Sequence, residues 1–188
     1  MKQQNTRGQF TLTREQIEKI IDAAENTRDR VLLKILAYTG ARRAEISGLT
    51  IHDFFRPDKR LKMRCKGKER LVPIPPHLAA DLTFYLGPRR TGFIFPARSG
   101  RAGLSGPQIN RIVAAAAERA KVKNPDPARR NVNPHIFRHS LARYLKSKNV
   151  QLEIIRDILG HKSIATTADT YGRPSMEEIQ KEYSAVLS

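Results

Sequence analysis

His135 and Arg138 stand three residues apart, just after Asn133 and Pro134, a pair that is typical of a helix start. Side chains at this spacing leave a helix on the same face, here near an N-terminus whose backbone N–H groups are unpaired. An imidazole, a guanidinium and these N–H groups together suit a phosphate oxygen. The pair therefore predicts an anion site. A basic helix also contains such a pair by chance, so the motif needs support from the rest of the chain.

Three further short motifs supply that support. They are TGARRAE at residues 39–45, CKGKERLVP at residues 65–73, and LGH at residues 159–161, ten residues before Tyr171. Together with HIFRHS at residues 135–140, and in this order, they resemble the motifs of the tyrosine recombinases, the family of phage integrases and Xer-like site-specific recombinases. The resemblance extends over nearly the whole chain, which makes it far more specific than any one motif.

The resemblance implies a set of site residues at the positions where this sequence carries the matching motifs. The implied catalytic residues are Arg42, Lys66, His135, Arg138, His161 and the nucleophile Tyr171. Lys68 is a nearby alternative to Lys66 as the catalytic lysine. Glu45 and His139 are implied as supporting residues.

The chemistry of this family explains why these residue types are needed without a metal or another cofactor. Attack of a tyrosine oxygen on a phosphodiester builds negative charge on the non-bridging oxygens, which the planar forks of Arg42 and Arg138 would stabilise. A phenol with an ordinary pKa near ~10 is a weak nucleophile at neutral pH and needs a base, for which His135 is the candidate. Lys66 would protonate the departing 5′ oxygen, and His161 would hydrogen-bond the phosphate.

The function that the resemblance implies is site-specific DNA recombination, in which strands are cleaved and rejoined through a 3′-phosphotyrosine, as in DNA integration and excision. Two alternatives stay open: strand relaxation of the type IB topoisomerase kind, and a catalytically silent DNA-binding module of the same fold. The compact spacing of the motifs favours recombination over relaxation. The presence of every expected catalytic residue type argues against a silent module.

Composition indicates an anionic partner. The 188 residues include 35 Lys or Arg and 18 Asp or Glu, which gives a formal net charge of +17. Self-repulsion of this size is usually neutralised by a polyanion, and the resemblance selects double-stranded DNA over RNA or a membrane surface. The cations that we expect to contact DNA are Arg60, Lys62, Arg64, Lys68 and Arg70. The family likeness also implies a homo-tetramer on DNA, with DNA-bending or directionality proteins as candidate accessory partners.

The chain has one cysteine, Cys65, and no apolar run of membrane-spanning length. Its N-terminus is polar and lacks a signal pattern. We expect a cytoplasmic, nucleoid-associated protein of prokaryotic or viral origin. Cys65 falls on the apolar side of its predicted strand and is interpreted as a small hydrophobic residue.

The elements that must position these residues are mostly helical. Capping residues and apolar periodicity predict helices at residues 13–25, 31–38, 42–49, 76–86, 106–122, 134–148 and 152–159. A short helix is expected from residue 163 toward 171, and a last one from residue 175. Alternation over residues 60–66 predicts a strand that pairs with residues 70–74 in an antiparallel hairpin. The expected fold is mainly α with a small antiparallel β-hairpin, that of a tyrosine recombinase catalytic domain.

We expect one catalytic domain, residues 13–188, after an N-terminal extension of residues 1–12. Family members usually carry a separate N-terminal DNA-clamping domain, and none is expected in this chain. The chain is then either part of a longer protein or a single-domain recombinase. In this family the C-terminal segment commonly docks on a neighbouring protomer, so exchange of residues 174–188 is a further hypothesis.

Overall fold

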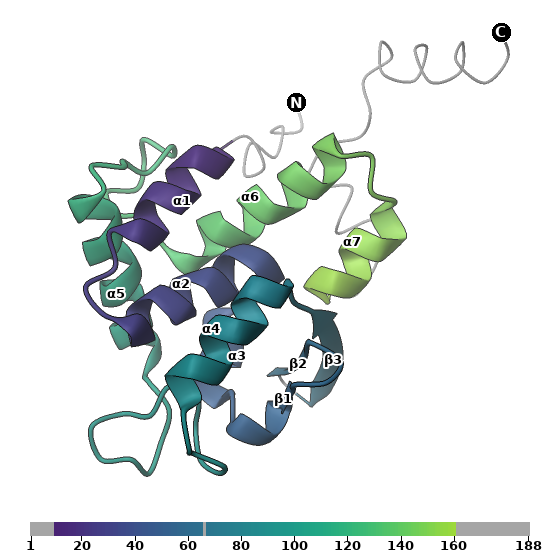
Figure 1. The fold of residues 1–188 in the computed structure, drawn as a ribbon. Helices are drawn as coiled ribbons and strands as arrows, with labels where there is room; N and C mark the ends of the chain where they lie inside the picture. The colour runs from purple at the N-terminus through teal and green to yellow at the C-terminus, as the bar shows by residue number, and fades with distance from the viewer. Residues whose placement is uncertain (1–9, 66, 161–188) are drawn as a thin grey trace, which may run out of the picture.

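The computed structural model describes residues 10–65 and 67–160 (Figure 1). Its helices are α1 (Arg14–Asp22), α2 (Thr27–Thr39), α3 (Arg43–Gly48), α4 (Pro76–Leu86), α5 (Gly106–Arg119), α6 (Pro134–Ser147) and α7 (Leu152–Leu159). Its strands are β1 (Phe54–Phe55), β2 (Arg60–Cys65) and β3 (Lys68–Pro73), with a short 3-10 helix, η2 (Ile51–Asp53), before β1. The expected class, mainly α with a small antiparallel sheet, is confirmed. None of the described helices is long and apolar enough to cross a lipid bilayer.

Helix α2 lies at the centre of the molecule because it is apolar on most of its faces. Leu32, Leu33, Ile35 and Leu36 are all completely shielded from solvent. The helix packs against α1, α4 and α6, which surround it in Figure 1. A helix covered on all sides in this way holds its C-terminal end at a fixed place, and that end leads directly into residues 39–45.

Capping residues set the helix starts that the sequence predicts. The Thr13 side chain accepts a hydrogen bond from the Gln16 N–H at 3.2 Å, and the Gln16 side chain accepts one from the Thr13 N–H at 2.9 Å. Ser105 caps α5 in the same reciprocal way. Helix α2 begins four residues earlier than predicted, because the Asn26 side chain accepts from the Asp29 N–H at 2.9 Å.

The three strands form one antiparallel sheet in the order β1-β2-β3. The predicted hairpin is confirmed, and its second strand begins at Lys68, two residues earlier than expected. Leu61 and Val72 face each other across the hairpin and are fully buried, as is Met63. The alternation in the sequence therefore gives the hairpin one face on the core and one face toward solvent.

Residues 87–105 carry contacts that the sequence does not predict. Thr50 pairs with Phe93 in an isolated β-bridge, and Pro96 pairs with Gly103 in another. A Cβ atom at Gly103 would lie 1.9 Å from the Ser47 carbonyl oxygen. Only glycine permits this close approach of the loop to the end of α3.

Helix α7 packs on α6 and on β3, at one side of the molecule (Figure 1). Leu141 and Ala142 of α6 meet Ile155 and Leu159 of α7 in a small hydrophobic cluster. The helix ends at Gly160, which has the left-handed φ of 65° that the predicted glycine stop requires. The C-terminal end of α7 is thereby placed beside the end of α2 and the hairpin.

Candidate active site

The turn that follows α2 brings the first predicted arginine motif against α6 and α7. Gly40 ends α2 with a φ of 60°, and a Cβ atom there would lie 2.6 Å from Cδ2 of Leu159 and 3.3 Å from Cδ2 of Leu141. The Thr39 hydroxyl donates to the Ile35 carbonyl at 2.6 Å and accepts from the Ala41 N–H at 3.2 Å. Thr39 and Gly40 therefore fix the sharp turn that places Arg42 at the start of α3.

Arg138 reaches this turn from α6. Its side chain is buried, with 5% of the residue exposed. Nη1 donates to the Gly40 carbonyl at 2.8 Å, and Nη2 donates to the Leu159 carbonyl at 2.5 Å. The guanidinium thus joins the end of α2 to the end of α7, and hydrogen bonds on two of its nitrogens fix its plane.

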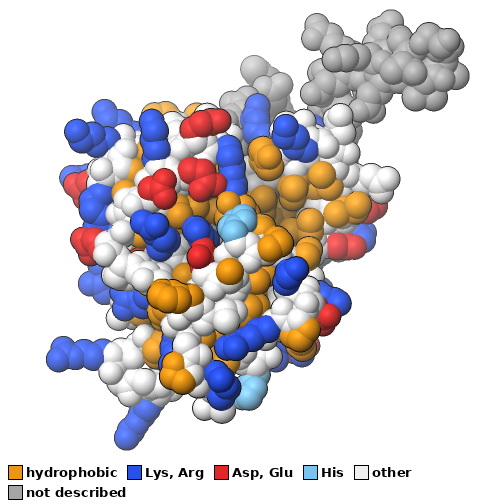
Figure 2. Space-filling model, in the orientation of Figure 1, with side chains coloured by type: hydrophobic (Ala, Val, Ile, Leu, Met, Phe, Trp, Pro, Cys, Tyr) orange, Lys and Arg blue, Asp and Glu red, His pale blue; other side chains and the backbone are white. Residues whose placement is uncertain are grey.

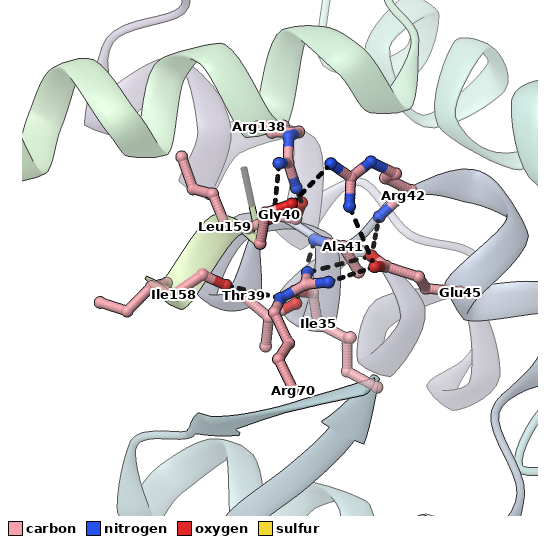
Figure 3. A network of polar contacts seen from close by, with 11 residues as sticks. Ile35, Thr39, Gly40, Ala41, Arg42, Glu45, Arg70, Arg138, Ile158 and Leu159 are labelled. Atoms are coloured by element: carbon pink, nitrogen blue, oxygen red, sulfur yellow. Dashed lines mark hydrogen bonds and ion pairs between the residues drawn. The ribbon is translucent and has the colours of Figure 1, made fainter. Parts of the chain in front are cut away.

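Arg42 occupies the N-cap position of α3 and lies next to Arg138 (Figure 3). Its side chain is about one-third exposed, and Nη2 donates to the Gly160 carbonyl at 3.0 Å. Because Arg138 and Arg42 bind the successive carbonyls of Leu159 and Gly160, the two guanidiniums converge at one place. The two arginines that the sequence pairs are therefore brought together.

Glu45 binds both the backbone and the side chain of Arg42. Its carboxylate is 1% exposed and accepts from the Arg42 backbone N–H at 2.6 Å and from Arg42 Nη1 at 3.3 Å. Burial alone would raise the pKa of this carboxyl. The hydrogen bonds and charge of Arg70, with those of Arg42, outweigh burial and hold the pKa of Glu45 below its ordinary value. The group is therefore an anion that orients the Arg42 guanidinium.

Arg70 was expected on the DNA-facing side of the hairpin, and the structure gives its guanidinium a different environment. The side chain is 12% exposed and points inward from β3. Both terminal nitrogens bind the Glu45 carboxylate, the Nη2 bond measuring 3.0 Å, and Nε donates to the Ile158 carbonyl at 2.8 Å. The alternation of the strand places this cation between the hairpin and α7, where its described contacts are with Glu45 and the Ile158 carbonyl.

His135 stands at the first turn of α6, where its backbone N–H donates to the Asn133 side chain at 3.0 Å. Partial burial of the ring lowers the pKa of His135, and the positive charges of Arg138 and Arg43 lower it further. The imidazole is therefore neutral at pH 7 and is able to accept a proton.

His139 follows one turn later on α6 and is half-buried. Burial lowers the pKa of His139 as well, followed by the charges of His135 and Arg138. The two histidines share a face of the helix with the buried guanidinium, so a positive charge on either ring is disfavoured.

The outer face of the hairpin carries Arg60, Lys62 and Arg64, three of the remaining predicted DNA contacts, whereas Lys68 pairs with Cys65 on the other face. Lys62 and Arg64 both bind Glu69, each at 2.8 Å, and Arg64 also binds Asp53 at 2.6 Å. The other two cations of this set, Arg60 and Lys68, are exposed. Cys65 is half-buried beside them.

Three expected catalytic residues, Lys66, His161 and Tyr171, lie outside the described residues. The hypothesis on residues 174–188 lies outside them too. The described part of the chain ends at Gly160, directly before His161, and Cys65 and Gly67, the neighbours of Lys66 in the sequence, are both described. Within residues 10–65 and 67–160, no group of His, Cys, Asp or Glu side chains is placed to hold a metal ion.

Two cations near His135 were not predicted from the sequence. Arg43 and Arg129 both lower the pKa of His135 through their positive charge. Arg129 also lines a surface hollow with Arg111, Arg130 and the α6 cap. The signal was the pair of arginines in the loop of residues 124–133, which directly precedes the helix that carries His135. Lys and Arg side chains are spread over the face in Figure 2, with acidic side chains among them.

The fold and the paired arginines define the class of a tyrosine recombinase catalytic domain. The chain belongs to the phage integrase family, whose model matches residues 11–178. It is 32% identical over 166 residues to the tyrosine recombinase XerA of Pyrococcus furiosus, a match that covers 84% of this chain and 55% of that protein. It is 34% identical over 161 residues to the tyrosine recombinase XerD of Mycobacterium tuberculosis, covering 80% of this chain and 49% of that one.

Among solved structures, the fold resembles that of the XerH site-specific recombinase bound to its difH substrate in a pre-cleavage complex. The TM-score is 0.77 at 25% identity, and the match covers 93% of this chain and 53% of that one. The chain thus spans about half the length of the relatives that it matches.

Proposed function

We propose that this chain is the catalytic domain of a site-specific DNA recombinase, formed by residues 13–188, which cleaves and rejoins DNA through a 3′-phosphotyrosine. The observation that carries the proposal is the convergence of Arg42 and Arg138 on the end of α7, beside the neutral His135. The family membership and the DNA-bound state of the related XerH structure support double-stranded DNA as the substrate.

In the proposed reaction the scissile phosphate binds between Arg42 and Arg138. The Tyr171 oxygen attacks phosphorus and forms the P–O bond of the 3′-phosphotyrosine, while the bond from phosphorus to the 5′ oxygen breaks. His135 accepts the phenolic proton, and Lys66 donates a proton to the departing 5′ oxygen. His161 hydrogen-bonds the phosphate. Attack by a 5′ hydroxyl reverses these transfers and reseals a strand without ATP.

Two fixed guanidiniums are most effective where charge develops in the transition state. The Arg138 fork is already ordered by its hydrogen bonds to the Gly40 and Leu159 carbonyls. The pre-ordered fork reduces the reorganisation that phosphate binding would otherwise require. The neutral His135 supplies the base that the phenol needs at pH 7.

Assembly as a homo-tetramer on DNA belongs to the same proposal, with residues 174–188 exchanged between protomers. The apolar surface of α6 and α7 supports it, because Tyr144 is 42% exposed and Ile154 is 47% exposed. In Figure 2, hydrophobic side chains gather on the surface where α6 and α7 lie in Figure 1. Removal of residues 174–188 should then abolish cooperative assembly on DNA. Unchanged cooperativity would exclude exchange.

The experiment that tests the function uses a nicked suicide duplex built from DNA that neighbours the gene. The wild-type chain should form a covalent adduct that survives denaturant, and Tyr171→Phe should form none while it still binds DNA. Binding without any adduct would indicate a silent module. Relaxation of supercoiled DNA without strand exchange would instead indicate a topoisomerase.

A further inference from the structure

Three consecutive carbonyls at the end of α7 each accept a hydrogen bond from a different arginine (Figure 3). Arg70 Nε binds the Ile158 oxygen at 2.8 Å, Arg138 Nη2 binds the Leu159 oxygen at 2.5 Å, and Arg42 Nη2 binds the Gly160 oxygen at 3.0 Å. The last carbonyls of a helix have no partner within the helix and carry the negative end of its dipole. Cations from β3, α6 and the start of α3 therefore fix one helix end.

Arg70 differs from the other two arginines because its guanidinium also binds Glu45, the carboxylate that binds Arg42. Its two terminal nitrogens bind both oxygens of Glu45, and Glu45 in turn binds the backbone and the side chain of Arg42. The Arg70 side chain also lies close to Gly160, where a Cβ atom would come within 2.9 Å of Arg70 Cδ and 3.0 Å of Nη1. One guanidinium thus connects β3, α3 and the end of α7.

We propose that Arg70 is a positioning residue for strand transfer, which fixes Arg42 through Glu45 and fixes the end of α7 that His161 follows. This inference rests on the proposed function. In this proposal Arg70 acts on neither the phosphate nor the nucleophile directly. Its effect reaches the reaction through the direction of the Arg42 fork.

The physical reason is competition for Arg42. Glu45 is a buried carboxylate whose charge must be compensated, and Arg70 supplies most of that compensation. Without Arg70, the carboxylate would draw the Arg42 guanidinium inward, away from a phosphate. A lysine at this position keeps the charge but cannot bind two carboxylate oxygens and a carbonyl at the same time, because it lacks the planar fork.

The first test measures the free protein and needs no cleavage. Arg70→Lys should accelerate amide hydrogen exchange at Gly160 and at Arg42, whose backbone N–H donates to Glu45, while α2 stays protected. Arg119→Lys is the matched control, because Arg119 makes the same kind of contact elsewhere, with Nε on the Ala23 carbonyl at 2.8 Å and Nη1 on Glu25 at 2.7 Å. Unchanged exchange at both sites in Arg70→Lys would overturn the inference.

The second test measures single-turnover cleavage of the suicide duplex. Arg70→Lys should bind DNA with unchanged affinity and cleave about 10²-fold more slowly, the cost of a slightly misplaced catalytic group. Arg119→Lys should cleave at the wild-type rate. An unchanged rate in Arg70→Lys, or a loss of DNA affinity that accounts for the slower cleavage, would contradict positioning.

A modified duplex distinguishes whether Arg70→Lys slows cleavage through Arg42 or through Lys66. When sulfur replaces the bridging 5′ oxygen, the leaving group departs without a proton, so a defect in Lys66 is rescued and a defect in phosphate stabilisation is not. The Arg70→Lys defect should persist on this substrate, and rescue would overturn the inference. If the wild-type chain forms no adduct at all, the proposed function fails, and hydrogen exchange still decides on Arg70.

Discussion

The guanidinium of Arg138 donates a 2.8 Å hydrogen bond to the carbonyl of Gly40, a residue 98 positions away in the chain. The same glycine has a φ of 60° and has no room for a side chain against Leu159. The Thr-Gly turn and the His-x-x-Arg motif are therefore joined in space, and a backbone oxygen of the turn orders the guanidinium of Arg138.

Replacing Gly40 should destabilise the whole domain. In Gly40→Ala, the left-handed φ and the contact of 2.6 Å with Leu159 should lower the free energy of unfolding by about 2 kcal/mol, measured by chemical denaturation. Gly48→Ala is the control, because nothing lies within 4 Å of a Cβ atom there. It should be neutral or stabilise by up to about 1 kcal/mol. Equal stability of the two variants would mean that Gly40 is not constrained.

Removal of the Arg138 fork should separate cleavage from binding. In Arg138→Ala, cleavage of the suicide duplex should fall by about 10³-fold, because an aligned donor to the developing charge is lost. DNA affinity should fall by less than about tenfold, since one phosphate contact is a small part of the electrostatic footprint. Arg138→Lys should retain binding and still cleave slowly, because it lacks the fork. Wild-type cleavage by either variant would refute the role given to Arg138.

Acid titration of the free protein should find His135 and His139 neutral at pH 7. Both pKa values lie below the ordinary value of 6.5, so each ring should take up its proton only at pH values lower than that, as followed by NMR. The unfolded chain binds these protons first, so stability should fall as the pH decreases from 6.5 through the folded pKa values. Arg43→Gln removes a positive charge and should raise the pKa of His135. A pKa above 6.5 in the wild-type chain would contradict the geometry.

The ion pairs on the hairpin should restrain its contribution to DNA binding. Glu69→Gln releases Lys62 and Arg64 from their shared carboxylate, which should raise DNA affinity at low salt and steepen its salt dependence. Fluorescence anisotropy at several salt concentrations measures both quantities. Glu25→Gln, in the loop after α1, removes the same charge away from the hairpin and serves as the control. Identical salt slopes for the two variants would argue against contact between the hairpin and DNA.

Local signals in the sequence predict much of the fold. Helices α4 and α7 have the predicted bounds, because Pro76 opens one and Gly160 closes the other. The pairing of Arg42 with Arg138 was implied by the family resemblance, and the turn at Gly40 and the Asn133 cap are the local parts of it that the sequence indicates. The sequence predicts less accurately the bounds of elements that depend on contacts with distant parts of the chain. The bridge from Thr50 to Phe93 has no local signal, because its stabilising partners lie on other parts of the chain.

The place of Arg70 is the clearest example of a long-range effect. Alternation along β3 places Arg70 on the same face as Lys68 and the buried Val72, but it does not indicate which groups the guanidinium contacts there, and Arg70 was expected to meet DNA. The packing of α7 on β3 covers this position, and the buried Glu45 supplies a charge that attracts it inward. Neither the position of α7 nor the burial of Glu45 follows from residues close to Arg70 in the sequence.

The hydrogen bonds to the three carbonyls at the end of α7 also restrict the number of residues that this helix can contain. One residue inserted within α7 would rotate Ile158, Leu159 and Gly160 by about 100° around the helix axis and advance them by about 1.5 Å. The arginines that bind them belong to other elements and cannot follow this rotation. The three contacts are therefore compatible with only one length of α7. An insertion or deletion in that helix would break all three hydrogen bonds at once.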